Sequence, residues 1–342
     1  MNNRLSYSSV NKYLFCGEAF RLHYREGYRP KTTSSALLFG KALDNAFGYI
    51  LTGKNESDQE VANEYEYFDY YWRMQYINDV PTNLFDNPNG VIVYSKYDID
   101  YDLLTQEEKR EAKSDQDKIA WFSMRHKGHL MIDAFKRDFL PLVEKIYSTQ
   151  ELIELENEDG DKSIGYCDCV AKLKGYDKPI ILDFKTAARP YVEDSVEHSV
   201  QLSQYLHFLS DKYENTRLAG YVVFIKNIAK NKTKVCAKCG FDGSGTKFKT
   251  CNNEVGNTRC NGDWEEKINP KCEMQLLVNE IPQSVENFVI DNIATVNHAI
   301  KCGIFTKNVN GCRDAGFGRP CDFYEKCWKN KEESLVKVEV KK

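Results

Sequence analysis

Residues 180–186 read IILDFKT, and they carry the clearest structural signal in the chain. A short apolar run between turn residues is typical of a buried strand, in which successive side chains point to opposite faces. Asp183 and Lys185 therefore share one face, and Phe184 lies on the other. Buried charges are costly unless they are paired or bind a metal. The segment thus indicates a chemical site at the end of a core strand.

The segments around this strand alternate between strand and helix patterns. ELIELEN (151–157) and IGYCDCVAKL (164–173) predict two strands before it, separated by the turn signals EDGDKS and GYDKP. An amphipathic pattern predicts a helix over about 192–213, and LAGYVVFIK (218–226) predicts a fourth strand. The order β-β-β-α-β predicts an α/β fold in which helices flank a central mixed sheet.

The flanking sequence predicts mostly helices. A capped helix is expected to begin near Ser6, and further helices are expected over 35–51, 117–146 and 284–301, with a strand over 274–282. We expect three parts. They are a helical N-terminal region with the α/β core (1–229), a cysteine-bearing insertion (230–267), and a strand, helix and cysteine-rich tail that closes on the N-terminus (268–342).

Composition excludes several classes of protein. The chain has 342 residues, 42% of them apolar and 29% charged, and the net charge of −4 disfavours a globally cationic nucleic-acid coat protein. No run approaches the roughly 20 apolar residues of a membrane span, and the N-terminus lacks a signal-peptide core. These features predict a cytoplasmic protein without a membrane segment. Twelve cysteines in such a protein indicate metal ligation more than disulfides.

A second carboxylate accompanies the Asp183 strand. Asp168 lies between two cysteines in the preceding apolar strand. Two Asp residues on neighbouring strands, with Lys185 beside one of them, form a plausible site for a hard cation such as Mg²⁺. The competing interpretation is an internal Asp–Lys ion pair with strand-end charges facing solvent.

Helical segments supply further candidates. Asp44 has Gly40 and Gly48 one turn before and after it, which leaves space around its carboxylate. Gln201 and Tyr205 are four residues apart and share one face of the helix that follows the Lys185 strand. Ordinary packing of an amphipathic helix is the alternative for this pair.

The order of these motifs resembles the RecB-like branch of the PD-(D/E)XK nuclease superfamily, which includes AddB-type and CRISPR-associated exonucleases. The matching motifs are the Gly-Tyr-x-Asp strand of Asp168, the (D/E)xK strand of Asp183 to Lys185, and the QxxxY helix of Gln201 and Tyr205. The family's helix motif usually has His where this chain has Asp44. The resemblance covers about 38–226 and the two cysteine-bearing ends, and it implies a restriction-endonuclease-like core.

The chemistry that this resemblance implies is metal-assisted hydrolysis of a phosphodiester. Asp168, Asp183 and Asp44, with the carbonyl oxygen of Phe184, would hold Mg²⁺ or Mn²⁺. Lys185 would orient the attacking water or offset charge in the transition state. Gln201 and Tyr205 would contact the substrate backbone. Glu151 is a further candidate acid.

Four cysteines in the insertion predict a structural zinc site. The segment contains CAKCG, TCNN and RCNGDW, and so few apolar residues cannot fold without a metal. We therefore expect a zinc ribbon over 230–267. Surrounding lysines make it a candidate DNA-binding finger, although a lysine run is usually a solvated face. The zinc ligands are expected to be Cys236, Cys239, Cys251 and Cys260.

A second cysteine set lies at the two ends of the chain. RecB-like members with an iron–sulfur cluster supply one cysteine before the core and three after it, in a stretch that resembles CDFYEKC here. The resemblance implies a [4Fe–4S] cluster that joins the ends, whereas a second zinc ion or merely buried thiols are the alternatives. The implied ligands are Cys16, Cys312, Cys321 and Cys327.

The favoured hypothesis is a metal-dependent DNA exonuclease that acts on ends or single strands. The resemblance extends to phage proteins and implies roles in DNA recombination, repair or processing, with a helicase, single-strand-binding or recombination protein as partner. One alternative is a catalytically silent DNA-binding or assembly module on the same fold. Another is a redox switch, but no CxxC pair lies outside the insertion.

Overall fold

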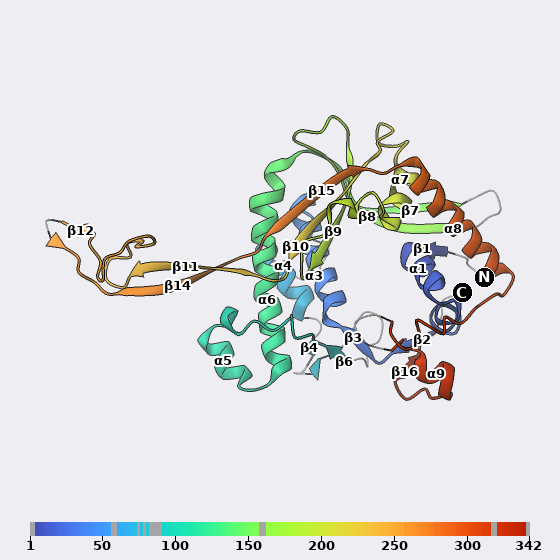
Figure 1. Cartoon of the computed structure of the whole chain (residues 1–342), viewed down its shortest axis with the longest axis horizontal. Helices are drawn as coiled ribbons and strands as arrows, with labels where there is room; N and C mark the ends of the chain where they lie inside the picture. The colour runs from blue at the N-terminus through green and yellow to red at the C-terminus, as the bar shows by residue number, and fades with distance from the viewer. Residues whose placement is uncertain are drawn as a thin grey trace.

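A computed structural model describes residues 4–55, 60–73, 76–77, 80–81, 91–156, 162–256, 258–315 and 320–339. Figure 1 shows a body built around one sheet, from which a long thin arm projects. None of the helices in these ranges is long and apolar enough to cross a membrane.

The body is organised by a six-stranded mixed sheet in the order β1-β8-β9-β10-β15, with β7 added to β8. Within this sheet, as far as the structure describes the chain, only the β1–β8 and β9–β10 pairs are parallel. Along the chain, β7, β8 and β9 are followed by a helix and then by β10, so the predicted order of three strands, a helix and a fourth strand is correct. The strands are β1 (Arg4–Ser6), β7 (Val143–Glu156), β8 (Lys162–Leu173), β9 (Ile180–Ala187), β10 (Leu218–Ile225) and β15 (Met274–Glu280).

Strand β8 divides the sheet. β7 pairs with β8 along its whole length, so β1 and β9 must share the opposite edge. On that edge, β1 pairs with residues 162–164 and β9 pairs with residues 169–171. On this edge of β8, residues 165–168 lie between the two partners and pair with neither of them. This fork in the sheet contains Asp168.

Both faces of the sheet are covered, and the alternation predicted for 180–186 is confirmed. Ile180, Leu182 and Phe184 belong to one buried cluster, and Ile181 belongs to another. Three helices supply the first cluster, and two lie on the side of the second (Figure 1). The first three are α3 (Ser35–Thr52), α4 (Glu64–Arg73) and α6 (Gln116–Ala134), and the others are α7 (Val200–Leu209) and α8 (Gln283–Lys301).

Local signals set the ends of these helices. Ser34 caps α3 by accepting a hydrogen bond from the Ala36 amide, and Gly53 ends it with a φ of 67°. The helix predicted over 117–146 is too long, because α6 ends at Ala134 and a strand begins at Val143. Between them lie a π-helical turn and a 3₁₀ turn that contains Pro141, which lacks the N–H an α-helix needs.

The helix predicted over 192–213 is also too long. α7 covers only Val200–Leu209, because the Ser199 side chain caps its first turn and accepts a hydrogen bond from the Leu202 amide. A short 3₁₀ turn and a bend precede this cap. The segment that separates β9 from α7 is therefore not helical throughout.

The insertion forms the arm (Figure 1). Two antiparallel strands, β11 (Ala229–Cys236) and β14 (Trp264–Lys271), leave the body between β10 and β15. At its end the arm bears a two-stranded piece made of β12 (Glu254–Val255) and β13 (Thr258–Arg259). Lys230 ties the base of the arm to Asp100 and Asp102 at 2.8 and 2.6 Å.

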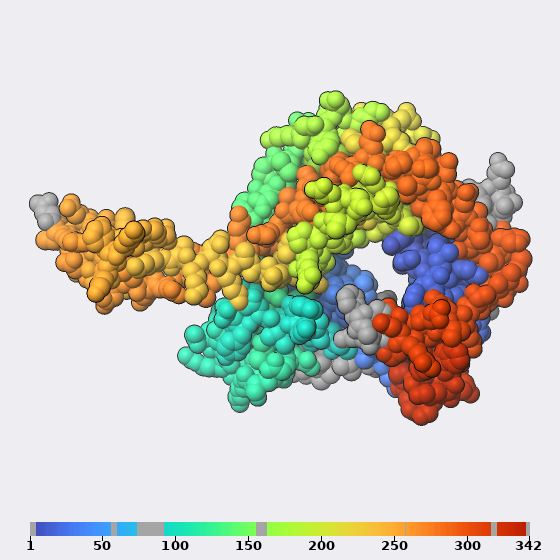
Figure 2. Space-filling view, in the orientation of Figure 1, coloured from blue at the N-terminus to red at the C-terminus, as the bar shows by residue number. Residues whose placement is uncertain are grey.

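The two ends of the chain lie together. α1 (Tyr7–Phe15) and α2 (Gly17–Phe20) flank Cys16, and β2 (Tyr28–Pro30) pairs with β16 (Leu335–Lys337) after α9 (Tyr324–Lys329). Figure 2 shows an opening through the molecule whose visible rim includes N-terminal (blue), yellow-green and C-terminal (red) parts of the chain. The remaining elements are β3 (Thr32–Ser34), β4 (Tyr76–Ile77), β5 (Val80–Pro81), β6 (Val91–Val93) and α5 (Gln106–Ala112).

Candidate functional site

Asp168 and Asp183 converge at the fork in the sheet. The Asp168 carboxylate accepts a hydrogen bond of 2.7 Å from the backbone N–H of Phe184, which joins β8 to β9 beyond their paired residues. Asp183 is buried, with 1% of its surface exposed, and its Oδ2 lies 2.6 Å from Lys185 Nζ. The structure thus places the two acids and the ammonium group of the sequence prediction side by side.

Asp44 joins this group from α3, and the electrostatics show how closely the acids interact. Burial, followed by repulsion from Asp183 and Asp44, holds the pKa of Asp168 well above its usual range. Burial raises the pKa of Asp44 to about 7, and the charge of Asp183 acts in the same direction. Burial also raises the pKa of Asp183, although Lys185 opposes it. Negative charge is therefore under-compensated here.

These carboxylates suit a hard divalent cation. Asp183 Oδ2 is buried and, despite the nearby Lys185 ammonium, receives no well-directed hydrogen bond. A cation would relieve the repulsion that disfavours ionisation of the acids. Among the described residues, only the cysteines of the arm bring three or more potential ligand atoms within 4.8 Å of one another. The three carboxylates are thus more widely spaced than the thiols.

Lys185 links the acids to α7. Its ammonium group donates a hydrogen bond of 3.0 Å to Gln201 Oε1, and Gln201 Nε2 donates one of 2.8 Å to the Tyr205 hydroxyl. Burial alone would lower the pKa of Lys185, but Asp183 and Asp168 act together against burial and the pKa is raised. Contacts to the substrate backbone were expected for Gln201 and Tyr205; in the structure Gln201 contacts Lys185, and Tyr205 contacts Gln201.

Two cavities flank the Lys185–Gln201 hydrogen bond. One, of about 290 Å³, is lined by Asp44, Gly40, Phe184 and Lys185 among others. The second, of about 280 Å³, lies beside Gln201 and Tyr205 and is lined also by residues 6–8 and 164–166. Gly165 allows this arrangement, since a Cβ there would lie 3.0 Å from the Tyr205 ring.

Sequence reasoning missed Tyr221 and the start of α1. Tyr221 of β10 lies in register with Asp183, and its ring centroid is 6.0 Å from Lys185 Nζ. The sequence contains a signal for Tyr221, because this Tyr interrupts the apolar run LAGYVVFIK. Parallel pairing of β9 and β10 places it on the same face as Asp183. The Ser6–Ser8 contribution to a cavity had no such signal, because it depends on β1 joining β8.

Glu151, the further candidate acid, lies elsewhere. Its carboxylate accepts hydrogen bonds from Lys212 and from the Tyr213 hydroxyl. It sits on β7 in register with Cys167, across β8 from β9. Glu151 therefore forms an ion pair at the outer part of the sheet. The neighbours of Asp168, Cys167 and Cys169, are buried core residues as predicted.

The four arm cysteines form a compact cluster. Cys236 and Cys260 have their Sγ atoms 3.6 Å apart, as do Cys239 and Cys251. Four sulfurs at about 2.3 Å from a tetrahedral zinc ion are ~3.8 Å from one another, so the cluster fits zinc. Gly262 is required beside it, because a Cβ there would lie 2.7 Å from Cys236 Sγ.

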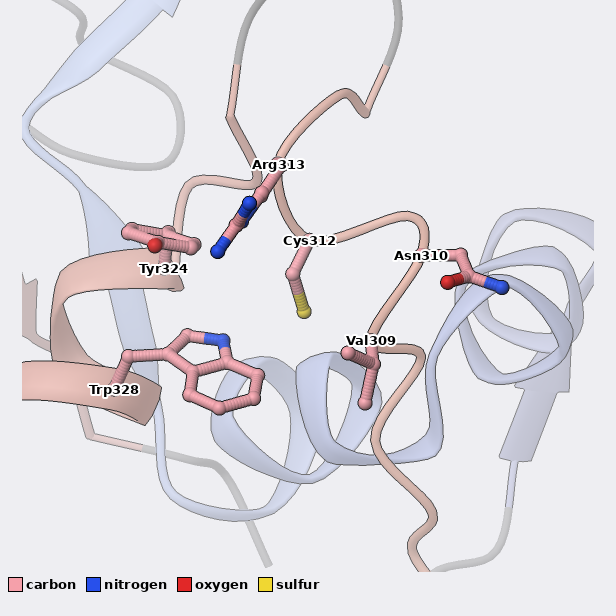
Figure 3. Close-up of a pocket in the computed structure, with 6 residues that line it drawn as sticks. All are labelled: Val309, Asn310, Cys312, Arg313, Tyr324 and Trp328. Carbon is pink, nitrogen blue, oxygen red and sulfur yellow. The ribbon is translucent and has the colours of Figure 1, made fainter.

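The second cysteine set assembles at the joined ends of the chain. Cys16, Cys321 and Cys327 belong to one packed cluster, and the Cys321 amide donates a hydrogen bond to the Cys312 carbonyl. The Asn308 amide points at Cys16 Sγ from 3.4 Å. Figure 3 shows the Cys312 sulfur pointing into a cavity of about 410 Å³ beside Trp328. These sulfurs are less tightly grouped than those of the arm.

That wider grouping bears on the kind of centre. The thiolates of an iron–sulfur cluster bind different iron atoms and stand further apart than those around one zinc ion. Lys12 interacts electrostatically with Cys321, and Lys307 does so with Cys327. Positive side chains of this kind would offset the negative charge of a cysteine-ligated cluster.

Comparison with solved structures gives a neighbour of low similarity. A provisionally assigned exonuclease from Eubacterium rectale is 11% identical and has a TM-score of 0.47, over 99% of this chain and 91% of that one. A comparison with curated proteins found no match.

A family comparison is more informative. The model of the PD-(D/E)XK nuclease superfamily matches residues 4–294, which include the central sheet and all three converging acids. The central mixed sheet with helices on both faces is consistent with the restriction-endonuclease-like core of that family. This chain belongs to the PD-(D/E)XK nuclease superfamily.

Proposed function

We propose that this nuclease is a metal-dependent deoxyribonuclease of the RecB-like type, with Mg²⁺ or Mn²⁺ at the fork of the sheet. The observation that carries the proposal is the convergence of Asp168 and Asp183 beside Lys185, in a setting where negative charge is under-compensated. Asp44 and the Phe184 carbonyl complete the proposed ligand set.

A bound divalent cation would supply Lewis-acid polarisation of the phosphoryl group and a more acidic water. The chain's own residues orient the reactants. The Phe184 amide holds the Asp168 carboxylate in place, and Gln201 holds the Lys185 ammonium group near the acids. Lys185 is thus positioned to offset negative charge as the phosphodiester is attacked. Tyr205 restrains Gln201 through its hydroxyl.

We infer that the enzyme is an exonuclease, as the resemblance to RecB-like exonucleases implies. An exonuclease needs a strand end at which to begin, whereas an endonuclease accepts an internal segment. Linear and circular single-stranded DNA of the same sequence distinguish the two activities. We expect the linear form to be degraded and the circular form to persist. Equal loss of both would contradict the exonuclease assignment.

We also propose an identity for each cysteine centre. The Sγ distances of the arm suit Zn²⁺, and the looser set at the chain ends suits a [4Fe–4S] cluster. Anaerobically purified protein should be brown, with absorbance near ~400 nm and both iron and zinc in the metal analysis. A colourless protein that contains only zinc would overturn the cluster.

The alternative of a silent DNA-binding module has less support. A protein that had lost catalysis would have no need to keep Asp168 and Asp183 together beside Lys185 at a site that destabilises the charges of both acids. A role in DNA recombination or repair with a helicase or single-strand-binding partner stays a prediction from the resemblance.

Substitution of Asp183 is the direct test of the proposed activity. Asp183→Asn keeps the volume of the side chain and removes its charge, so we expect cleavage of labelled DNA with Mg²⁺ or Mn²⁺ to fall by about 10³-fold or more. Glu151→Gln is a matched control, since Glu151 is engaged away from the site. Equal cleavage by wild type and Asp183→Asn would reject the assignment.

A further inference from the structure

The arm presents a compact group of aromatic and basic side chains outside the nuclease core. Lys234 Nζ lies 5.1 Å from the Trp264 ring centroid, and Arg259 lies at the same distance from the Phe248 ring. Trp264 Nε1 and Lys234 Nζ both donate hydrogen bonds to the Phe248 carbonyl, at 3.0 and 3.3 Å. We call these four residues the Phe248 patch.

The patch is both exposed and held in place. The Phe248 side chain is 51% exposed although its backbone is tied to β11 and β14. Gly243 packs so closely on Trp264 that a Cβ would lie 2.3 Å from the indole ring. A metal ion bound by the neighbouring cysteines would also fix the loop that carries Phe248. An exposed aromatic ring on a pre-ordered support can contact a ligand without a large loss of conformational entropy.

The charge of the arm indicates an anionic ligand. Residues 229–271 contain nine basic and five acidic side chains, in a chain with 47 basic and 51 acidic residues overall. Four thiolates around a zinc ion would add about two net negative charges. The excess of basic over acidic side chains in the arm is larger than this. Positive charge is therefore concentrated on the arm and is depleted elsewhere.

We propose that the Phe248 patch binds single-stranded DNA at a second site, away from the metal centre. Exposed rings stack on unpaired bases, and flanking Lys and Arg contact phosphates, whereas the bases of a duplex are already stacked. This proposal rests on the proposed function, because the identification of the ligand as DNA comes from there. It gives the nuclease a contact with a strand segment that is not in the catalytic site.

The distance of the arm from the fork makes the effect depend on strand length. Figures 1 and 2 show the arm extending away from the body, and β12 lies near its tip. A strand of about 8 nucleotides can occupy the catalytic site alone, while one of about 40 can also reach the arm, if each site spans the ~4–16 nucleotides common for such surfaces. Tethering at two sites then increases affinity for the longer strand.

The test compares DNA binding and cleavage by the triple variant Lys234→Gln, Phe248→Ala and Arg259→Gln. Fluorescence anisotropy with labelled oligo-dT, without added divalent cation, should show Kd for the long strand raised at least ~tenfold. Loss of two phosphate contacts should also reduce the slope of log K against log[salt] by ~1.4. Cleavage of the short strand should keep its wild-type rate. Zinc content and thermal stability must match wild type.

A matched control carries a comparable change on the body. Lys96 lies 5.1 Å from the exposed Tyr97 ring, so Lys96→Gln with Tyr97→Ala removes a similar cation–ring pair. We expect this control to bind the long strand as wild type does. Equal long-strand affinity in the triple variant and wild type would overturn the arm proposal, and so would binding of duplex alone by the patch.

Binding and cleavage separate this proposal from the nuclease assignment. If the wild type cleaves DNA and the triple variant binds normally, the arm proposal fails and the nuclease stands. If the wild type binds long strands through the patch but cleaves none, the arm proposal stands and the nuclease assignment fails. If the wild type binds no single-stranded DNA, the arm proposal is wrong, and a protein ligand becomes the better explanation.

Discussion

At the scale of single residues, the proposed site consists of a chain of contacts rather than of isolated groups. Asp183 contacts Lys185, Lys185 donates to Gln201, and Gln201 donates to Tyr205. Tyr205, the last member, lies four residues after Gln201 on α7. Its position in the sequence is equally compatible with ordinary packing of an amphipathic helix. Its hydroxyl restrains the Gln201 amide, and through it the ammonium group beside the acids.

Tyr205→Phe removes only that hydroxyl. We expect the single-turnover cleavage rate to fall by ~tenfold, because one hydrogen bond contributes roughly 0.5–1.5 kcal/mol and a tenfold change in rate corresponds to about 1.4 kcal/mol. The ring stays buried, so thermal stability should change little. Tyr213→Phe is the control, since the Tyr213 hydroxyl donates to Glu151 away from the site. An unchanged rate in Tyr205→Phe would show that Gln201 needs no such restraint.

At the scale of elements, the helices on the first face of the sheet pack closely enough to require specific glycines. Gly128 of α6 faces Phe68 of α4, and a Cβ at Gly128 would lie 2.2 Å from the ring. Phe68 has no exposed surface and cannot move away without disturbing the core. α3, which carries Asp44, packs against both of these helices.

Gly128→Ala should therefore lower the free energy of unfolding, by about 1–3 kcal/mol as for overpacked cores. Gly40→Ala is the matched control within a helix, since no atom lies within 4 Å of its added methyl group. That substitution should leave stability unchanged or raise it by up to ~1 kcal/mol. Urea denaturation of both variants measures the difference. A Gly128→Ala protein as stable as Gly40→Ala would contradict the close packing.

An ion-pair network also joins α4 to α6. Asp69 is buried and accepts hydrogen bonds from Arg125, and it forms one with His129. Burial alone would raise its pKa, but the bonds from His129 and Arg125 lower the pKa of Asp69 to about 2. A depressed folded-state pKa stabilises the fold above the unfolded value, near ~4, and this contribution disappears as the pH falls toward ~2.

Asp69→Asn should reduce the free energy of unfolding at pH 7 by about 2 kcal/mol. The difference from wild type should shrink as the pH falls from ~4 to ~2, because the wild-type carboxylate then takes up a proton. Comparing the two proteins at each pH cancels metal loss, which both share. A difference that stays constant to the lowest pH would show that the charge of Asp69 is not its source.

At the scale of the whole molecule, the two ends of the chain meet in one cluster. Cys16 precedes the core, and Cys312, Cys321 and Cys327 follow it. The β2–β16 pair joins the same ends through backbone hydrogen bonds. The proposed cluster and this strand pair would therefore hold the N-terminal residues 6–8, which line a cavity beside Tyr205, against the rest of the molecule.

Cys16→Ser should remove the proposed iron–sulfur cluster and lower the midpoint of thermal unfolding by about 5 °C or more, because binding of such a centre contributes to folding. Zinc in the arm should be retained, since its four ligands lie elsewhere. Cys302→Ser is the control because Cys302 is exposed. Iron and zinc analysis with calorimetry checks the outcome. Unchanged iron content in Cys16→Ser would exclude Cys16 as a ligand.

Local chemistry in the amino-acid sequence was enough to predict several parts of the molecule. The alternation in IILDFKT predicted which side chains lie on each face of β9, and the spacing of the cysteines predicted the cluster in the arm. The order of strand and helix patterns along the chain predicted the central strands. Each of these predictions depends on residues that are close together in the sequence. Two helices were predicted to be longer than they are. The signals that limit them, Pro141 and Ser199, are also local in the sequence.

Features that depend on strands and helices distant in sequence could be seen only in the folded molecule. The fork in β8, the register of Tyr221 with Asp183 and the entry of residues 6–8 into a cavity follow from β1, β9 and β10 taking particular neighbours. Such pairings depend on burial of whole faces, which no single segment encodes. The elevated pKa of Asp44 likewise depends on burial beside acids that are far away in the chain.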